Sequence, residues 1–446
     1  MDPDAPKIAP VPDSPQPASS PSTRLSDERS SADSRRAALG AALLYLALAS
    51  LYGIVASQLW TDDFSAGLVV ADAVAWHRNF AAATPETPLL LSRPGYLFLW
   101  LYQVSPHANS ALNAILLAIT TAIVTLTAGR VANARAAIVT GAAMALNPWL
   151  WVLTFGPTKE PFALISAAAT ALFAVAPTRR HATLAVLTIL VTAPVRLEQS
   201  IMFAAILVAS LLIRGVKRPV LVLTGIAAFS LAVGVVLFAV GERLMGLAFY
   251  DLSPQLWPLQ STQVVGREGA IGEIGRALGE RGWNDPAWNA LAIWYRLAAN
   301  LLGCIWRMGV VTVDGGPSVI GIGQAVSGII VIAGLLVTFV RLRRRDDLEA
   351  RGLAVHFLII WLGTALVAFV QPRYLLVELP VAIAALATAT PALRRRILLV
   401  TIGLALLGRL AFFLAGFGIP ADRHIGGPRP PFLELPLTHR VPQPPT

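Results

Sequence analysis

Two adjacent carboxylates, Asp62 and Asp63, follow directly on the first long apolar run of the chain. An ionised carboxylate just outside such a run can act as a general base toward a sugar hydroxyl or an amine. Because neighbouring carboxylates also push each other's pKa values apart, the pair suits acid–base chemistry. The alternative interpretation is an acidic pair in solvent that caps a helix starting near Phe64.

Arg93 stands further along, directly before Pro94 and a short aromatic segment. Proline is common in the first helical turn, so the pair predicts a helix that begins here. The backbone N–H groups of a helix N-terminus already favour an anion, and a guanidinium adds a planar fork that matches phosphate oxygens. An interfacial arginine that binds lipid headgroups is the alternative.

Three short turns between apolar runs carry further ionisable residues: Lys159 with Glu160, then Arg196, then Arg373 beside Tyr374. The helix dipole alone could favour Glu160 in the first turn of a helix, and a lone arginine could simply extend to the interface. Charge at the edge of hydrocarbon nevertheless costs free energy, which favours a functional role. Several cations brought together would bind phosphate or pyrophosphate. The cations considered are Arg78, Arg93, Lys159, Arg196 and Arg373.

No sequence pattern here requires a metal or a cofactor. The six histidines are scattered, and the single cysteine, Cys304, can form no intramolecular disulfide. Neither an HExxH-like pairing nor a phosphate-binding or dinucleotide-binding glycine motif is present, which disfavours nucleotide-driven transport. A divalent ion could still bind Asp62 or Asp63, although nothing in the sequence implies one.

The composition predicts an all-α protein, a polytopic transmembrane helical bundle. Hydrophobic residues make up 56% of the chain and charged residues only 13%, too few charges for an ordinary soluble domain. Many apolar runs are long enough to cross a hydrocarbon core of about 30 Å as helices. Eleven spans are expected, at 37–59, 109–129, 136–154, 159–176, 181–197, 199–213, 219–240, 317–340, 352–371, 374–392 and 397–417.

Basic residues gather in alternate connections between these spans, which predicts a cytoplasmic N-terminus and an extracytoplasmic side for the residues discussed above. The net charge of +10 therefore reflects membrane orientation, and nucleic acid is not an expected partner. The basic residues assigned to the cytoplasmic connections are Arg130, Arg135, Arg179, Arg180, Arg214, Lys217, Arg218, Arg341, Arg343, Arg344, Arg345, Arg351, Arg394, Arg395 and Arg396.

The chain divides into a disordered cytoplasmic tail (1–36), a transmembrane domain (37–417) and a Pro-rich C-terminal tail (418–446). The first segment is rich in Pro, Ser and Asp and cannot bury enough apolar surface to fold alone. A long outer loop is expected at 241–316, and its tryptophans predict that it lies along the membrane surface as interfacial helices.

In their order, these motifs resemble the GT-C superfamily of polytopic glycosyltransferases, which use polyprenyl-phosphate sugars. The likeness is strongest to the protein mannosyltransferase and lipid A aminoarabinose transferase group. It covers roughly residues 38–392 as short ordered motifs. The matching residues are Asp62-Asp63, Arg93-Pro94-Gly95-Tyr96-Leu97-Phe98, Lys159-Glu160-Pro161-Phe162, Val195-Arg196-Leu197-Glu198 and Arg373-Tyr374.

The resemblance implies a GT-C-like fold in the inner membrane and transfer of a sugar from a polyprenyl phosphate to an extracytoplasmic lipid, glycan or protein. Transfer would invert the sugar carbon without a covalent enzyme intermediate. Asp62 or Asp63 would activate the acceptor and Arg93 would contact the lipid phosphate. The chain departs from the pattern at Asp63, where Glu is common, and at Ser92, where an acid can stand; no large soluble domain follows the last span.

Two other classes are left open by the sequence. A repeat-unit polymerase or ligase of surface polysaccharide also has many spans and outer arginines, and uses lipid pyrophosphate donors. A transporter of a lipid-linked anion would need ionisable residues deep within spans, of which Arg409 is the main one found. The sequence specifies neither the sugar, nor the acceptor, nor the oligomeric state.

Overall fold

The computed structural model describes residues 21–60, 68–70, 73–74, 76–78, 93–213, 298, 300–305, 310–312, 317–343, 347–367, 372–414, 421–422 and 429–433. Within these residues the protein is helical, apart from two short strands that pair in parallel. The elements are α1 (Pro21–Leu59), α3 (Arg93–Val104), α4 (Ala108–Val131), α5 (Ala134–Ala145), α6 (Pro148–Thr154), α7 (Glu160–Val175), α8 (Arg179–Thr192), α9 (Leu197–Ile213), β1 (Val311–Thr312), α14 (Val319–Arg341), α15 (Leu348–Val367), η2 (Pro372–Glu378), α16 (Leu379–Thr388), α17 (Pro391–Leu414), β2 (Ala421–Asp422) and η3 (Pro431–Leu433).

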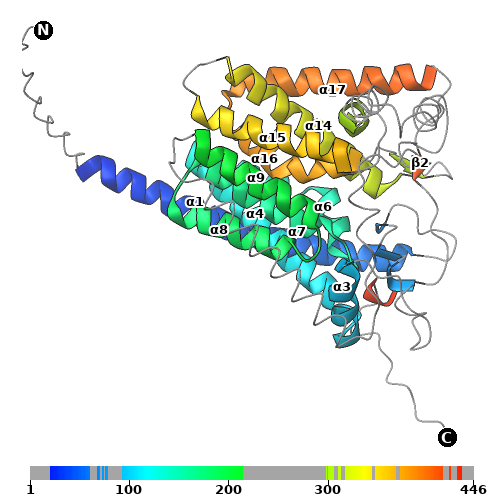
Figure 1. The fold of residues 1–446 in the computed structure, drawn as a ribbon. Coiled ribbons are helices and arrows are strands. Elements are labelled where there is room, and N and C mark those ends of the chain that lie inside the picture. Colours follow the sequence, from blue (N-terminus) through cyan, green and yellow to red (C-terminus); the bar gives the residue numbers. More distant parts are fainter. Residues whose placement is uncertain are drawn as a thin grey trace, which may run out of the picture.

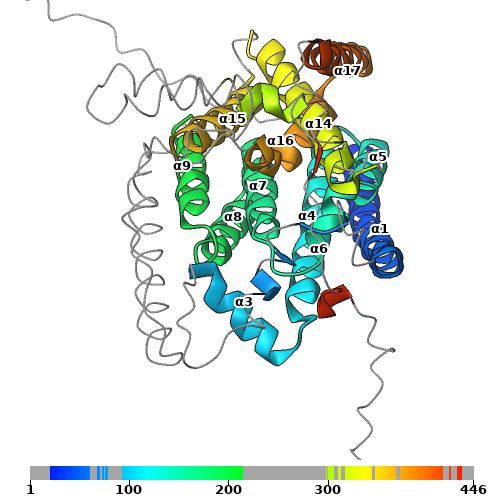
Figure 2. The same cartoon turned by 90° about the vertical axis from the view of Figure 1, so that its right-hand side faces the viewer.

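The helices form one elongated bundle with α7 at its centre (Figure 1). Viewed from its end, α7 and α16 lie in the middle, with α4, α9, α14 and α15 around them and α1 and α17 at the edges (Figure 2). Every residue of α7 is buried. A helix that is apolar on all sides is buried on all sides, and α7 is covered by α4, α8, α9, α15 and α16.

Three of the described helices are long and apolar enough to cross a membrane: Ala32–Leu59, Ala108–Val131 and Val319–Arg341. A fourth is counted if α5 and α6 together form one span. These helices mark the chain as a membrane protein, as its composition predicts. The span expected at 219–240 lies outside the described residues, and the count of eleven stays a prediction.

Two expected spans are not single helices. The expected span 136–154 is broken at Asn147, where α5 and α6 meet at an angle of 54°. Pro148 has no N–H and its ring clashes with the preceding turn, while the Asn147 side chain caps α6 by accepting from the N–H of Trp149 at 2.9 Å. The expected span 374–392 is likewise divided, because η2 precedes α16 and Pro380 follows their junction.

Glycines on α14 allow other segments to approach its backbone closely. A Cβ at Gly328 would overlap the carbonyl of Cys304, and one at Gly334 would overlap Ala382 of α16. Small residues at helix contacts are typical of membrane proteins. Cys304 and Asn300 are fully buried, so this part of the segment 241–316 packs against the bundle, and its position along the membrane surface stays a prediction.

Both chain ends depart from the expected tails. The first helix already begins at Pro21, within the segment 1–36 that is expected to be a disordered tail, and an Asp33–Arg36 contact of 3.8 Å accompanies this extension. Elongating a formed helix is far easier than nucleating one. At the other end, Arg429 donates to the Ser57 hydroxyl and to the Trp60 carbonyl, both at 3.4 Å.

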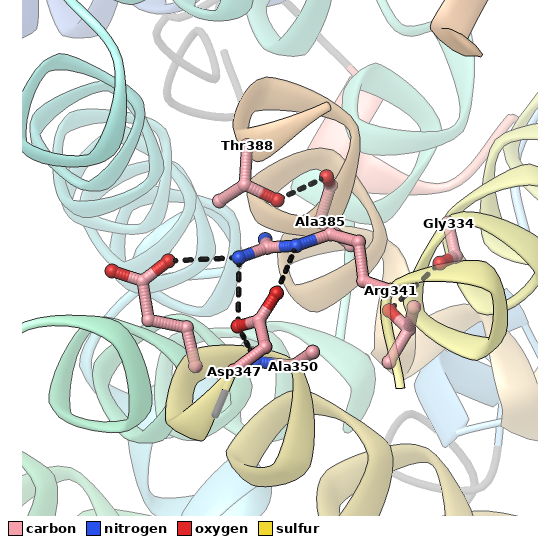
Figure 3. Close-up of polar contacts among 8 residues, drawn as sticks. Gly334, Arg341, Asp347, Ala350, Ala385 and Thr388 are labelled. Atoms are coloured by element: carbon pink, nitrogen blue, oxygen red, sulfur yellow. Dashed lines mark hydrogen bonds and ion pairs between the residues drawn. The ribbon is translucent and has the colours of Figure 1, made fainter. Parts of the chain in front are cut away.

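A polar contact closes the α14–α15 connection. The Arg341 guanidinium donates to both carboxylate oxygens of Asp347, at 2.7 and 2.9 Å, and to Glu349 at 3.1 Å (Figure 3). Asp347 also accepts from the N–H of Ala350, so it caps the start of α15. Two carboxylates therefore pair with the Arg341 guanidinium in this connection.

Candidate functional site

The turn before α7 is fixed by polar side chains of α4. The Asn113 amide donates to the Gly156 carbonyl at 2.8 Å and to the Thr158 hydroxyl at 3.0 Å, and the Gly156 N–H donates to Ser110 at 3.0 Å. Gly156 has φ +76°, a conformation that only glycine adopts readily. These contacts determine where Lys159 and Glu160 begin α7.

The turn between α8 and α9 is tied to the same end of α7. The Thr192 hydroxyl donates to the Phe162 carbonyl at 2.5 Å and lies 2.8 Å from the Ser166 hydroxyl. The N–H of Arg196 donates to the Thr192 carbonyl at 2.8 Å. The start of α9 is therefore held beside the first turns of α7, which places Arg196 next to Glu160.

Glu160 and Arg196 form a buried ion pair. The Arg196 guanidinium donates to Oε1 of Glu160 at 3.1 Å, and the two side chains are 6% and 7% exposed. The second carboxylate oxygen accepts from the N–H of Lys159 at 3.1 Å. A charge buried in apolar surroundings needs such a partner, since an unpaired one is strongly destabilising.

Two guanidinium groups lie against the ring of Tyr374. The Cζ atom of Arg196 is 5.0 Å from the ring centroid, and that of Arg373 is 5.6 Å away. Both lie within the range of a cation–π interaction. The positive charges of Arg373 and Lys159 also act on the Glu160 carboxylate.

Five of the residues expected at the site therefore meet, although they come from three distant parts of the sequence. We call them the cationic cluster: Lys159, Glu160, Arg196, Arg373 and Tyr374. It contains three cations and one carboxylate, so its formal charge is +2. Glu160 and Arg196 are buried, whereas Lys159, Arg373 and Tyr374 are partly exposed. This composition suits the cluster to bind an anion, because charge-assisted hydrogen bonds are strong and gain strength where water is partly excluded.

The cluster also has a hydrogen-bond donor to spare. The Nε of Arg196 is buried and has no hydrogen-bond partner within the described part of the chain, and the same holds for Oε1 of the neighbouring Gln199. A buried polar atom without a partner costs about 1–3 kcal/mol. A ligand oxygen placed at Arg196 would remove this cost.

Residues 76–78 lie close to the cationic cluster. The Lys159 ammonium is 5.6 Å from the ring centroid of Trp76. His77 packs edge-on against Phe432 at 5.9 Å between centroids, and partial burial, together with the charge of Arg78, lowers the pKa of His77. These contacts bring the first loop and the C-terminal segment to the end of α7 that carries Glu160.

Asp62 and Asp63, the two candidates for the expected general base, both lie outside the described residues. Their described neighbours are anchored to the bundle: Trp60, directly after α1, is buried, and the Leu68 carbonyl accepts from the hydroxyl of Tyr52 on α1 at 2.6 Å. Arg93 begins α3 as predicted, but its side chain is not among the described groups.

Sequence reasoning missed a second buried polar group, formed by Thr170, His356 and Glu378. His356 and Glu378 are buried inside the bundle and 3.0 Å apart. The signal was present, because an ionisable residue within an apolar run calls for a function or a partner. Arg409, the main charge expected within a span, lies on the peripheral α17 and is partly exposed.

In the part of the chain that the structure describes, no three His, Cys, Asp or Glu side chains lie together in a way that could hold a metal ion. The sequence matches no family model, and neither a curated protein nor a solved structure is significantly similar to it.

Proposed function

We propose that the protein is an integral-membrane glycosyltransferase that moves a sugar from a polyprenyl-phosphate donor to an extracytoplasmic acceptor. The observation that supports it most is the cationic cluster, a group of net positive charge around a buried ion pair at the end of an apolar helix. A polyprenyl phosphate carries its phosphate at the end of an apolar chain, so it matches both parts of this arrangement. The proposal includes a GT-C-like fold with about eleven spans, on the resemblance stated above.

In this proposal the cationic cluster binds the donor phosphate and stabilises it as it departs. Arg196 offers a buried Nε donor, and Glu160 and Tyr374 hold its guanidinium in place. Arg373 and Lys159 add positive charge. Such a preorganised site acts where negative charge develops during the reaction, and removing one donor costs about 3 kcal/mol in the barrier.

Asp62 or Asp63 takes a proton from the acceptor, whose oxygen or nitrogen then attacks the anomeric carbon. The bond between that carbon and the phosphate oxygen breaks, and the polyprenyl phosphate leaves with the bonding electrons. Attack from the face opposite the phosphate inverts the sugar carbon. Arg93, at the start of α3, contacts the same phosphate.

The proposed orientation of the protein in the membrane follows from the positions of its basic residues. Arg179 and Arg180 stand at the start of α8, one turn after the end of α7 that lies away from Glu160. Arg341 and Arg394 occupy further connections of the basic kind. If basic connections face the cytoplasm, the N-terminus is cytoplasmic and the cationic cluster faces the extracytoplasmic side of the inner membrane.

Binding of undecaprenyl phosphate tests whether the protein recognises the phosphate of the donor lipid. Native mass spectrometry of the purified protein should show undecaprenyl phosphate bound at least tenfold more tightly than undecaprenol, which lacks the phosphate. R373A should reduce this preference, since a hydrogen bond to a charged group contributes about 1.5–3 kcal/mol. R394A, at the start of α17, serves as the matched control. Equal binding of both lipids would overturn the proposal.

Turnover measurements test the sugar transfer itself and the assignment of Asp62 or Asp63 as its general base. Purified D62N and D63N variants are assayed for release of undecaprenyl phosphate from a panel of undecaprenyl-phosphate sugars. One variant should lose nearly all turnover while both still bind undecaprenyl phosphate. Full turnover in both variants would refute the assignment of the base. Turnover with pyrophosphate-linked donors alone would instead indicate a polymerase or ligase.

A further inference from the structure

Three polar side chains form a chain of contacts deep in the bundle. The His356 ring on α15 lies with Nε2 2.8 Å from the hydroxyl of Thr170 and with Nδ1 3.0 Å from a carboxylate oxygen of Glu378. All three residues are at most 1% exposed. They join α15 to the middle of α7 and to the junction between η2 and α16.

The Thr170 hydroxyl also donates to the Ser166 carbonyl at 2.7 Å. Whether Nε2 of His356 donates to this hydroxyl or accepts from it depends on the tautomer of the ring. In both tautomers the two ring nitrogens lie within hydrogen-bond distance of Thr170 on α7 and of Glu378 at the end of η2.

Glu378 is committed to this contact. It stands at the N-cap position of α16, yet its side chain makes no capping hydrogen bond to that helix. It turns to His356 instead. A buried acid that gives up the nearest backbone donors for a histidine on another element fixes the position of one element relative to the other.

Helices α7 and η2, which His356 connects through Thr170 and Glu378, also carry most of the cationic cluster. Helix α7 bears Glu160 at its start and Thr170 ten residues later, which is about 15 Å along an α-helix. The 3₁₀ helix η2 bears Arg373 and Tyr374 at its start and Glu378 at its end. The two elements are thus held together at two levels, through Arg196 at the cluster and through His356 deeper in the bundle.

Helix η2 needs support of this kind. It runs for seven residues, whereas 3₁₀ helices longer than three or four residues are uncommon because their hydrogen-bond geometry is poor. Pro372 begins it and Glu378 ends it. Without a fixed end, the position of Arg373 and Tyr374 relative to Glu160 would depend only on the packing of the buried apolar residues Leu375, Leu376 and Val377.

We propose that Thr170, His356 and Glu378 form a brace that fixes η2 against α7 and so positions Arg373 and Tyr374 in the cationic cluster. These three are positioning residues, since none of them belongs to the cluster itself. The proposal rests on the proposed function in one respect, which is that the cluster binds a lipid phosphate.

A double-mutant cycle on the full-length protein tests the brace. H356F removes both contacts of the ring and keeps its packing against Phe203. H356F and R373A should each weaken undecaprenyl phosphate binding about tenfold, and the double variant should bind no more weakly than R373A alone, because coupled residues are not additive. Additive losses, a hundredfold in the double variant, would show that His356 does not act through Arg373.

Two further variants keep the test decisive if H356F folds poorly. T170V removes only the hydroxyl and should weaken binding about threefold. T401V makes the same change at a buried threonine of α17 and should leave binding unchanged. Equal effects of T170V and T401V would indicate general loss of packing and would refute the brace.

Hydrogen–deuterium exchange separates this proposal from the proposed function, because it needs no ligand. H356F or T170V should raise exchange in residues 372–378 at least tenfold, and T401V should not. If exchange rises but the wild-type protein does not prefer undecaprenyl phosphate, the brace holds and the proposed function fails. Unchanged exchange in η2 overturns the brace whatever the lipid result.

Discussion

At the scale of single residues, the charged turns were the informative part of the sequence. The apolar surroundings of Lys159, Glu160, Arg196 and Arg373 made each charge an exception that needed a reason, and the fold brings all four together. The sequence could not indicate which acid meets which base. Glu160 and Arg196 are 36 positions apart, and their contact depends on how Thr192 ties α8 to α7.

The Glu160–Arg196 pair leads to a prediction about stability. R196A leaves a buried carboxylate without its partner and should destabilise the protein by about 3–5 kcal/mol. The double variant E160Q/R196A removes both charges and should recover much of this loss. Thermal unfolding of the purified proteins measures the difference. If the double variant is less stable than R196A, the two residues do not act as a pair.

At the scale of elements, the sequence predicted the helices and their order, but it did not predict where a helix within one apolar run is broken. The Asn147-Pro148 signal for a helix break was present in the sequence, yet the apolar run across it predicted one span. The structure divides it, because Asn147 caps α6 and also donates to Ser327 of α14 at 3.0 Å. Contacts with α14 therefore decide where this helix ends, and such contacts are not visible in hydropathy.

The close approach to α14 can be tested with glycines. G328A should strongly lower the yield of folded protein, since a Cβ there would overlap the backbone carbonyl of Cys304, and backbone cannot move aside as a side chain can. G403A, on α17, is the matched control, because a Cβ at Gly403 has no atom within 4 Å. Size-exclusion profiles and unfolding temperatures give the comparison. Equal behaviour of the two variants would contradict the packing described for residues 300–305.

At the scale of the whole molecule, the bundle joins distant parts of the chain at the end that carries the cationic cluster. Phe155 packs against Gly53 of α1, and Asn113 of α4 holds the turn that follows it. The sequence predicted a membrane bundle with its charged turns at one end. It gave no sign that the C-terminal segment returns to that end, because a Pro-rich composition alone reads as an unfolded tail.

The C-terminal segment 429–433 should stabilise the end of α1, which leads into the proposed base residues Asp62 and Asp63. Phe432 is buried against Gly156 and His77, and Arg429 contacts the end of α1, two residues before Asp62. F432A removes a buried aromatic ring, a change that costs about 3–5 kcal/mol. Hydrogen exchange should therefore rise in residues 52–60 and 155–158 and stay unchanged in α17.

In the same F432A variant, turnover should fall by more than lipid-phosphate binding, because Arg196 and Arg373 keep their places while the anchor before Asp62 and Asp63 is lost. A uniform rise in exchange across the bundle would mean that Phe432 supports the fold as a whole and not this end of it.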